Sequence, residues 1–264
     1  MAIITISRGS YHNGRAVAEK LADKLGYECV SRDRIIDQLE DFHLPEIKLK
    51  RGLNDAFSLL DRFPNGKKRY ITAMRAALLK KFCQGNIVYH GLSGHHYIKT
   101  ISHVLKIRIV ADLQNRVEAE MKRADISAEK ARMLLKKDDE ERRKWAMFLY
   151  DIDLFDSSLY NLVIRIGHFS EDDAVKILAD ASQLPLFQET PESKAELEDA
   201  ALEAEVDQAL FDFPTAQVHV KDRHVRVGLK LPEDQKEEIQ QRIEGLLEPI
   251  EGIASQEFDI APYY

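Results

Sequence analysis

Apolar positions in the first two thirds of the chain predict short strands that alternate with helices. Five short runs have the length of buried strands: residues 2–7, 28–30, 86–89, 104–110 and 162–166. Helical spacing over 14–25 places Val17 and Leu21 on one face, and a long polar, helical excursion over 31–85 follows the second strand. This alternation predicts an α/β fold with a parallel five-stranded sheet flanked by helices.

The pattern changes after residue 187. The later segments predict an acidic helix, a hairpin that turns at Asp222-Arg223, a second helix and a final strand: residues 196–210, 216–231, 233–247 and 255–260. This order is typical of a small α+β domain. We therefore expect one domain over 1–187, an acidic linker over 188–195 and a second domain over 196–264.

Charge follows the same division. The chain carries a net charge of −7, which divides into +5 over residues 1–187 and −12 over residues 188–264. No apolar run approaches the roughly 20 residues of a membrane-spanning helix. Met1 leads directly into the first strand, so we expect a cytoplasmic protein without a membrane span. Cys29 and Cys83 lack metal or redox spacing, which favours two reduced thiols over a disulfide.

A candidate phosphate-binding segment lies between the first strand and the first helix. It consists of Gly9, Ser10, Tyr11, His12, Asn13, Gly14, Arg15 and Ala16. The spacing is that of a P-loop, in which backbone N–H groups and a helix N-terminus face phosphate. Arg15 replaces the usual Lys, and Ala16 replaces the Ser or Thr whose hydroxyl binds Mg²⁺. An ordinary turn with a solvated Arg15 is the alternative.

Several further blocks, in a fixed order along the first domain, give a more specific indication of its kind than this loop alone. The blocks are residues 6–8, 14–15, 18–22, 24–27, 88–94, 108–112 with Arg116, 136–145 and 159–164. Together they resemble the cytidylate kinase-like family, a branch of the P-loop nucleoside monophosphate kinases, over roughly 1–183. In that family Arg commonly takes the place of the loop Lys, which Arg15 matches. The resemblance implies a P-loop kinase-type fold, ATP as cofactor and nucleotide substrates.

A basic segment with the family's lid motif follows the fourth strand. Six cations fall within 21 residues: Arg123, Arg132, Lys136, Lys137, Arg142 and Arg143. Asp139 and Arg142 stand at i and i+3, a spacing that lets the carboxylate orient the guanidinium toward phosphate. We expect the catalytic groups to be Arg15, Arg142, Asp139, Arg123 and Arg132. The alternative is a solvated helix with pairs such as Asp138 with Arg142 and Asp139 with Arg143.

The resemblance places the acceptor nucleotide after the second and third strands. The residues expected to bind it are Arg32, Asp33, Arg75, Gly91 and Ser93. Arg32 and Asp33 reverse the family's Asp-Arg order, and Leu92 stands where the family often has Arg. His90, His95 and His96 lack a further ligand at diagnostic spacing, so we expect no metal site there.

The last part of the chain is similar to a BON domain, a small α+β module credited with binding lipids or other ligands. The similarity rests on residues 218–222, 225–227, 233–243 and 250–253 and covers about 196–262. Arg223-His224 replaces the Gly that usually follows Asp222. We expect a sensing or interaction role with an unknown ligand or protein partner.

These features favour an enzyme that transfers the ATP γ-phosphate to a nucleoside monophosphate, and CMP and dCMP are the acceptors expected before any other. Mg²⁺ would be held mainly through the nucleotide and water, since Ala16 has no oxygen to offer. The alternatives are a nucleotide-binding regulator without catalysis, favoured by Ala16 and Leu92, and a kinase for another small acceptor. Nucleic-acid binding is not expected, because the cations lack interleaved aromatic residues. Deleting 188–264 is expected to leave nucleotide binding intact.

Overall fold

The computed structural model describes residues 2–37, 39, 60, 65–92 and 94–262. Parts of the predicted polar excursion, together with Ser93, lie outside the described residues. None of the helices described in these ranges is long and apolar enough to cross a membrane.

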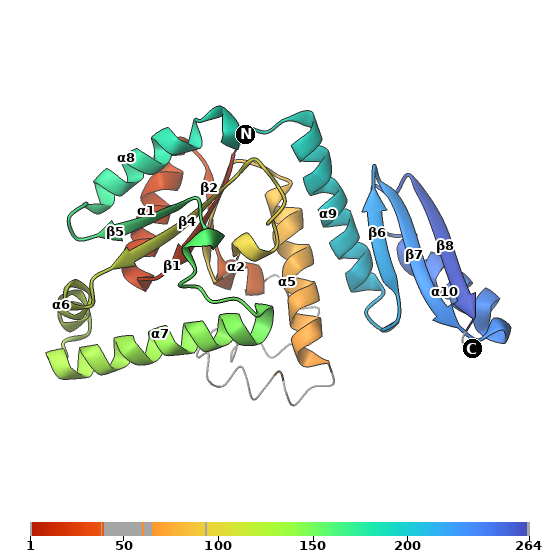
Figure 1. Ribbon diagram of the computed structural model, residues 1–264, viewed down its shortest axis with the longest axis horizontal. Coiled ribbons are helices and arrows are strands. Elements are labelled where there is room, and N and C mark those ends of the chain that lie inside the picture. The colour runs from red at the N-terminus through yellow and green to blue at the C-terminus, as the bar shows by residue number, and fades with distance from the viewer. Residues whose placement is uncertain (1, 38, 40–59, 61–64, 93, 263–264) are drawn as a thin grey trace.

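Five parallel strands form the central sheet, as the apolar runs predicted (Figure 1). They are β1 (Ile3–Arg8), β2 (Glu28–Ser31), β3 (Ile87–Gly91), β4 (Val104–Ala111) and β5 (Leu162–Ile166). Their order is β2-β3-β1-β4-β5. The observed bounds differ from the predicted runs by one or two residues, which is the usual uncertainty of strand ends.

Helices cover both faces of this sheet. They are α1 (Tyr11–Leu25), α2 (Arg32–Asp37), α5 (Gly66–Phe82), α6 (Leu113–Ala124), α7 (Ala128–Tyr150) and α8 (Glu171–Ser182). Side chains of a strand alternate between faces, so Ile4 packs with α1 and α8 while Ile3 packs with α5 and α7. Trp145 of α7 is fully buried in the second of these cores. The two apolar layers determine which face of the sheet each helix covers.

One row of residues crosses the sheet at the level of the carboxyl ends of β1 and β3. Ser7 of β1 pairs with Gly91 of β3 on one side and with Arg108 of β4 on the other. Arg108 in turn pairs with Val163 of β5. Adjacent strands are about 4.8 Å apart, so these residues lie side by side at the end of the sheet where open α/β folds bind ligands.

A second, three-stranded sheet follows in the order β6-β7-β8. Its elements are β6 (Gln217–Lys221), β7 (His224–Leu231), α10 (Lys236–Leu247) and β8 (Ser255–Pro262), with β6 antiparallel and β8 parallel to β7. The hairpin turns at Asp222 and Arg223, as predicted, and both have positive φ, 49° and 63°. The Asp199 carboxylate accepts hydrogen bonds from both of their N–H groups, at 2.7 and 2.9 Å.

Helix α9 (Pro191–Ala209) joins the two parts and lies between α5 and β6 (Figure 1). Thr190 caps it, so residues 191–195 of the predicted linker are helical, because a capping box forms between Thr190 and Ser193. Leu197 packs in the core with α5, whereas Val206 packs in the core of the second sheet. The helix therefore contributes to both hydrophobic cores.

Candidate functional site

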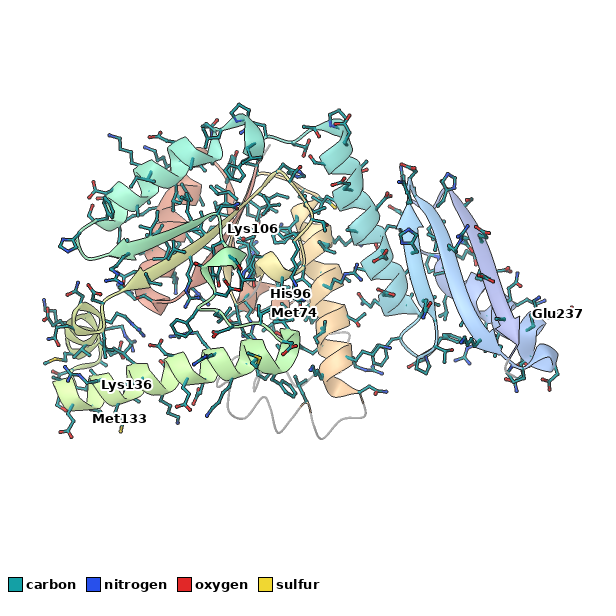
Figure 2. All side chains as sticks on the ribbon, in the orientation of Figure 1. Met74, His96, Lys106, Met133, Lys136 and Glu237 are labelled. Atoms are coloured by element: carbon teal, nitrogen blue, oxygen red, sulfur yellow. The ribbon has the colours of Figure 1, made fainter. Side chains whose placement is uncertain are left out.

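A pocket of about 470 Å³ lies between α1, α6 and α7. Six of the residues that line it are Ser10, His12, Arg15, Arg116, Arg123 and Asp138. The pocket brings the predicted phosphate-binding segment together with Arg123 of the predicted lid. Lys136 and Met133 lie on the first half of α7, the helix that runs below the sheet (Figure 2).

Gly9 connects β1 to α1 and lies tightly against β4. Its N–H and that of Ser10 both donate to the Ile109 carbonyl, at 2.8 and 3.2 Å. A Cβ at Gly9 would lie 2.8 Å from Val110 Cγ1 and 3.0 Å from the Ile109 oxygen. Only glycine therefore allows this close approach of the connection to β4.

The helix begins earlier than the predicted phosphate-binding loop allows. The sequence predicted a helix that starts at Gly14, but α1 starts at Tyr11, and the Gly14 N–H donates to the Ser10 carbonyl at 3.0 Å. The Ser10 hydroxyl also donates to Asn13 Oδ1 at 2.7 Å, which closes the first turn. N–H groups of a first turn have no acceptor within the helix, and the helix dipole makes this end positive. The segment therefore presents a helix N-terminus to an anion instead of a long loop.

Arg15 lies one turn further along α1. Its Nε donates to Glu19 Oε1 at 2.8 Å, and the side chain is 55% exposed. Asn13 contacts the other neighbouring helix, since its Nδ2 donates to Glu171 Oε1 at 3.2 Å. Arg15 thus borders the pocket from its solvent side.

Asp139 of α7 holds two arginines. It accepts hydrogen bonds from Arg116 Nη1 and Nη2 at 2.7 and 2.9 Å, and it also contacts Arg142. The predicted contact between Asp139 and Arg142 is confirmed. Arg143 instead pairs with Asp153 at 2.9 Å. Burial lowers the pKa of Arg142, although Asp139 opposes the shift.

Sequence reasoning gave Arg116 no role, although it lies in one of the blocks that carry the resemblance. The residue is only 9% exposed and lines the pocket. Its position on the first helix after β4, four residues after Asp112, is the one signal that could have identified it. The bidentate pair with a distant lid residue is a tertiary contact and could not be seen in the sequence.

The two other predicted lid arginines take different positions. Arg123 pairs with Glu120 at 2.6 Å and lines the pocket. Its hydrogen bonds lower the pKa of Glu120. Arg132 donates to Gln114 Oε1 at 3.1 Å on an exposed face, and it is not among the pocket-lining residues that the structure describes.

Arg32 and Gly91 come together on the predicted acceptor side. Arg32 is buried, donates to the Tyr70 hydroxyl at 3.1 Å and lies 4.0 Å from Asp33. A Cβ at Gly91 would lie 2.7 Å from Arg32 Cβ and 2.7 Å from the Tyr89 hydroxyl. The Arg32 guanidinium is therefore buried beside the Tyr70 hydroxyl, at the end of the sheet where the sequence predicted the acceptor.

Arg75 does not join this group. Its guanidinium forms ion pairs with Glu203 at 2.6 Å and Asp207 at 2.8 Å, both on α9. The sequence assigned Arg75 to the acceptor because the excursion is basic, but the acidic helix packs against that face of α5. Arg75 therefore holds α9 to the first domain.

The three histidines after β3 are buried or half-buried. Burial lowers the pKa of His90 to about 4, of His95 to about 3 and of His96 to about 4. Across the described part of the chain, no three His, Cys, Asp or Glu side chains are grouped to hold a metal ion. The histidines are therefore neutral packing residues at pH 7, and His95 packs 4.9 Å from the Tyr160 ring.

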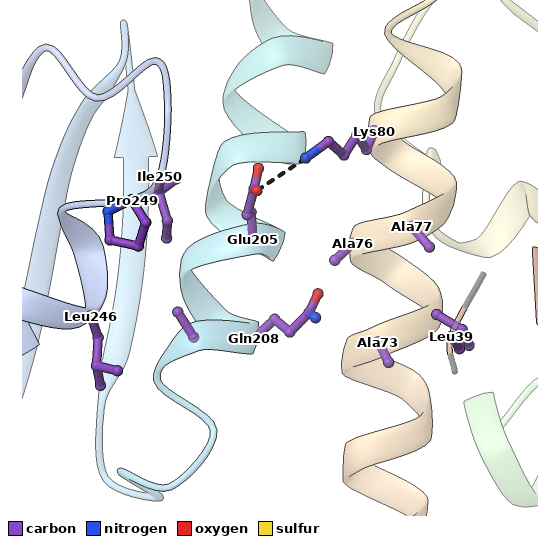
Figure 3. Close-up of a pocket in the computed structure, with 11 residues that line it drawn as sticks. Leu39, Ala73, Ala76, Ala77, Lys80, Glu205, Gln208, Leu246, Pro249 and Ile250 are labelled. Atoms are coloured by element: carbon purple, nitrogen blue, oxygen red, sulfur yellow. Dashed lines mark hydrogen bonds and ion pairs between the residues drawn. The ribbon is translucent and has the colours of Figure 1, made fainter. Parts of the chain in front are cut away.

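A second groove, of about 490 Å³, lies between α5, α9 and the end of α10 (Figure 3). Ala73, Ala76 and Ala77 of α5 form one wall, and Leu246 and Ile250 lie on the opposite side. Lys80 and Glu205 form an ion pair of 3.2 Å between α5 and α9. This groove is lined mainly by apolar side chains and is separate from the pocket at α1.

The parallel sheet, the helix N-terminus at its edge and the basic helices around one pocket define an α/β phosphotransferase of the kinase type. The model of the cytidylate kinase-like family matches residues 3–168, and the chain belongs to this family. Family membership supports a nucleoside monophosphate kinase.

Individual relatives agree with this assignment. A cytidylate kinase of Archaeoglobus fulgidus is 27% identical over 184 residues, which are 69% of this chain and 94% of the relative. A cytidylate kinase of Pyrococcus horikoshii is 33% identical over 179 residues, 68% of this chain and 87% of the relative. The solved structure of an uncharacterized protein from Eubacterium ventriosum has the same fold, with a TM-score of 0.55 at 19% identity over 69% of this chain and 97% of that one.

Proposed function

We propose that the protein transfers the γ-phosphate of ATP to a nucleoside monophosphate, with CMP or dCMP as the acceptor. The observation that carries the proposal is the meeting of the α1 N-terminus, Arg116 and Arg123 at one pocket. The family match over residues 3–168 and the cytidylate kinases among the relatives support the same reaction. The bond from the γ-phosphorus to the β-phosphate bridging oxygen breaks, a bond to an acceptor phosphate oxygen forms, and ADP leaves.

Each group has a role in this proposal. The segment from Gly9 to Ala16 binds the ATP phosphates through the first turn of α1 and Arg15. Arg142 and Arg123 neutralise charge on the phosphoryl group in transfer, with Asp139 as the residue that positions Arg142. Arg132 joins them only when the lid closes, since it lies on an exposed face here.

The acceptor is bound on the other side of β1. Arg32 binds the acceptor phosphate, and Gly91 allows the Arg32 and Tyr89 side chains to pack closely against the end of β3. Asp33, 45% exposed, is expected to accept a hydrogen bond from a hydroxyl or amino group of the acceptor. Arg75 is not part of this proposal, because its two ion pairs commit it to α9.

Mg²⁺ is expected to accompany ATP. Mg²⁺ prefers oxygen ligands and keeps several of its waters, and the pocket offers the carboxylates of Glu19, Glu120 and Asp138. Ala16 also lines the pocket and supplies no oxygen. The pocket therefore fits a hydrated ion held mainly by phosphate oxygens, with carboxylates accepting hydrogen bonds from its waters. The bound ion would screen the negative charge of the phosphates.

The second candidate is a nucleotide-binding regulator without turnover. Arg15 pairs with Glu19, and Ala16 offers no metal ligand; both features weaken the donor side of a kinase. In this version the BON-like domain around β6-β7-β8 senses a ligand or protein partner, and the apolar groove beside α10 is where the ligand binds. The two free cysteines, Cys29 and Cys83, agree with a cytoplasmic location for either candidate.

Measurement of ADP release with ATP and each nucleoside monophosphate tests the kinase. We expect turnover with CMP or dCMP, and a loss of about tenfold or more on Arg15→Ala. Arg226→Ala is the matched control, because Arg226 pairs with Glu257 on the exposed second sheet. No turnover with any acceptor, set against calorimetric binding of ATP, would favour the regulator.

A further inference from the structure

Arg108 is a buried arginine whose hydrogen-bond and ring partners are all neutral; the Asp153 carboxylate senses its charge but forms its ion pair with Arg143. Arg108 is 6% exposed. Its Nη1 donates to Ser7 Oγ at 3.3 Å and to the Tyr160 hydroxyl at 3.4 Å, both long for hydrogen bonds. The rings of Phe155 and Tyr160 lie 5.2 and 5.7 Å from its guanidinium carbon. Within the described ranges, no carboxylate lies within 4.0 Å of Arg108 in an ion pair.

This arrangement distinguishes Arg108 from Arg116 and Arg142. Arg116 forms an ion pair with Asp139, and Arg142 forms an ion pair with the same carboxylate. A guanidinium taken out of water without a counter-charge is costly, and hydroxyl groups and ring faces only partly offset that cost. Such a cost is retained where an anion binds, so the partners of Arg108 indicate an anion site.

The position of Arg108 places that anion beside the carboxyl end of β1, where the chain leads into α1. A Cβ at Gly9 would lie 3.3 Å from Arg108 Nη2, so the guanidinium touches the connection that leads into α1. On the sheet, Arg108 is in register with Ser7, and Ser7 with Gly91, which contacts Arg32. Arg108 therefore lies between the start of the donor helix and the buried acceptor arginine.

The face of the sheet decides which phosphate is within reach. Ile107 and Ile109 of β4 pack in the core with α1 and α8, so Arg108 faces the opposite side, together with Ser7 and the residues around Arg32. A side chain on that face would reach a phosphate chain bound at the start of α1 from the side of the sheet on which Arg32 lies. Phe155 covers the guanidinium and is itself 63% exposed, so the site borders solvent.

We propose that Arg108 binds the γ-phosphate of ATP, the group in transfer, from the acceptor side of the sheet. This assignment rests on the proposed function, because it presumes that ATP occupies the pocket at α1. The planar guanidinium donates to two phosphate oxygens while Ser7 and Tyr160 hold it in place. Arg108 is then a specificity residue for a triphosphate donor over a diphosphate.

Calorimetric titration of ATP and ADP into the wild-type protein, Arg108→Met and Arg108→Lys tests this role. We expect Arg108→Met to lower the affinity for ATP by about tenfold or more, since a charged hydrogen bond is lost, and to leave the affinity for ADP within about twofold. Arg108→Lys keeps the positive charge but lacks the planar guanidinium. Its affinity for ATP is expected to lie between that of the wild-type protein and that of Arg108→Met. Equal losses for ATP and ADP, or no loss for either, would overturn the assignment.

A thermal melt without nucleotide separates binding from structure. If Arg108 only supported the fold, Arg108→Met would lower the melting temperature; we expect it unchanged or higher, because a buried charge without a counter-ion is removed. If Arg108→Met does not fold, Arg108→Lys is used instead. A lower ratio of ATP affinity to ADP affinity than in the wild-type protein supports the assignment, and an unchanged ratio contradicts it.

Failure of the proposed function gives a different result. A wild-type protein that binds neither nucleotide contradicts the proposed function, and the anion site is then judged with inorganic phosphate. Phosphate is expected to raise the melting temperature of the wild-type protein more than that of Arg108→Lys. An equal rise in both contradicts an anion site at Arg108.

Discussion

Arg116 and Asp139 form a bidentate pair, with Nη1 and Nη2 of the arginine 2.7 and 2.9 Å from the two carboxylate oxygens. The pair joins α6 to α7, and the same carboxylate contacts Arg142. One acidic residue therefore orients two cations, of which Arg116 lines the pocket, and its removal affects both.

Asp139→Asn is expected to lower kcat by about tenfold or more and to destabilise the protein by about 2 kcal/mol. The buried Arg116 would lose its counter-charge, and Arg142 would lose its orientation. Turnover and urea unfolding measure the two effects. Glu140→Gln on the same helix is the control, since its pair with Lys144 is exposed and contributes little. A full-activity Asp139→Asn protein would show that the pair has no role in transfer.

Gly9→Ala is expected to weaken nucleotide binding strongly. The added methyl group would lie 2.8 Å from Val110 Cγ1 and 3.0 Å from the Ile109 oxygen, so the connection into α1 must move away from β4. Gly245→Ala is the matched control, because a Cβ there meets no described atom within 4 Å and the residue lies inside α10. The control should gain about 0.5–1 kcal/mol of stability. Titration with ATP measures nucleotide binding by each variant, and urea unfolding measures its stability. Normal ATP binding by Gly9→Ala would show that the close approach of Gly9 to β4 is not required for binding.

Arg75→Ala is expected to loosen the attachment of α9 and to leave the kinase reaction unchanged. It removes ion pairs to Glu203 and Asp207, and burial already raises the pKa of Asp207 in spite of Arg75. We expect a loss of about 1–2 kcal/mol, because these side chains are only partly exposed. Lys80→Ala, whose pair with Glu205 is exposed, should cost less than about 0.5 kcal/mol. A large rise in KM for the acceptor in Arg75→Ala would restore the original assignment of Arg75 to acceptor binding.

The same contacts bear on deletion of residues 188–264. Leu197 and Ala204 of α9 belong to the core that α5 shares with the central sheet. A fragment that ends at residue 187 would expose this apolar surface, whereas one that ends after α9 would keep it. We expect the longer fragment to have the higher melting temperature.

Stability is expected to fall as the pH drops from 6.5 toward 4. Burial lowers the pKa of His90, His95 and His96 to between about 3 and 4 in the folded protein, below the ordinary value of 6.5. In this range the unfolded chain binds protons that the folded chain does not, so acid favours unfolding. Each such histidine contributes a slope of about 1.4 kcal/mol per pH unit.

The histidine contribution can be isolated with one variant. His95→Phe keeps a ring against Tyr160, so the slope of unfolding free energy against pH should become shallower by one histidine. His168→Gln is the control, because His168 is exposed. An unchanged slope in His95→Phe would show that His95 takes up its proton without cost.

Local patterns were sufficient for most of the fold. Strands of the central sheet are continuous apolar runs because both of their faces are covered, and this makes them visible in sequence. The turn at Asp222-Arg223 was also predicted correctly, since only two residues separate the paired strands. The start of α1 was placed too late, because the motif spacing was given more weight than the capping potential of Ser10.

The site was predicted less completely, because its contacts join residues far apart in the chain. Arg142 and Asp139 are three residues apart, and helical periodicity alone brings them together. Arg116 meets Asp139 across 23 residues, and Arg75 meets Asp207 across 132. Neither the run of basic residues nor the order of the family's sequence blocks could indicate which of the many arginines faces α9 and which faces the pocket.

The sequence by itself determined the alternation of strands and helices, the division of charge and the family resemblance, since each depends on neighbours within a few turns of the chain. Only the tertiary structure decided how the cations are used. Arg75 is neutralised by an acidic helix, Arg116 is held by a carboxylate, and Arg108 is buried among hydroxyls and rings. These assignments depend on burial and on distances across the fold, which determine whether a positive charge already has a partner or remains available to phosphate.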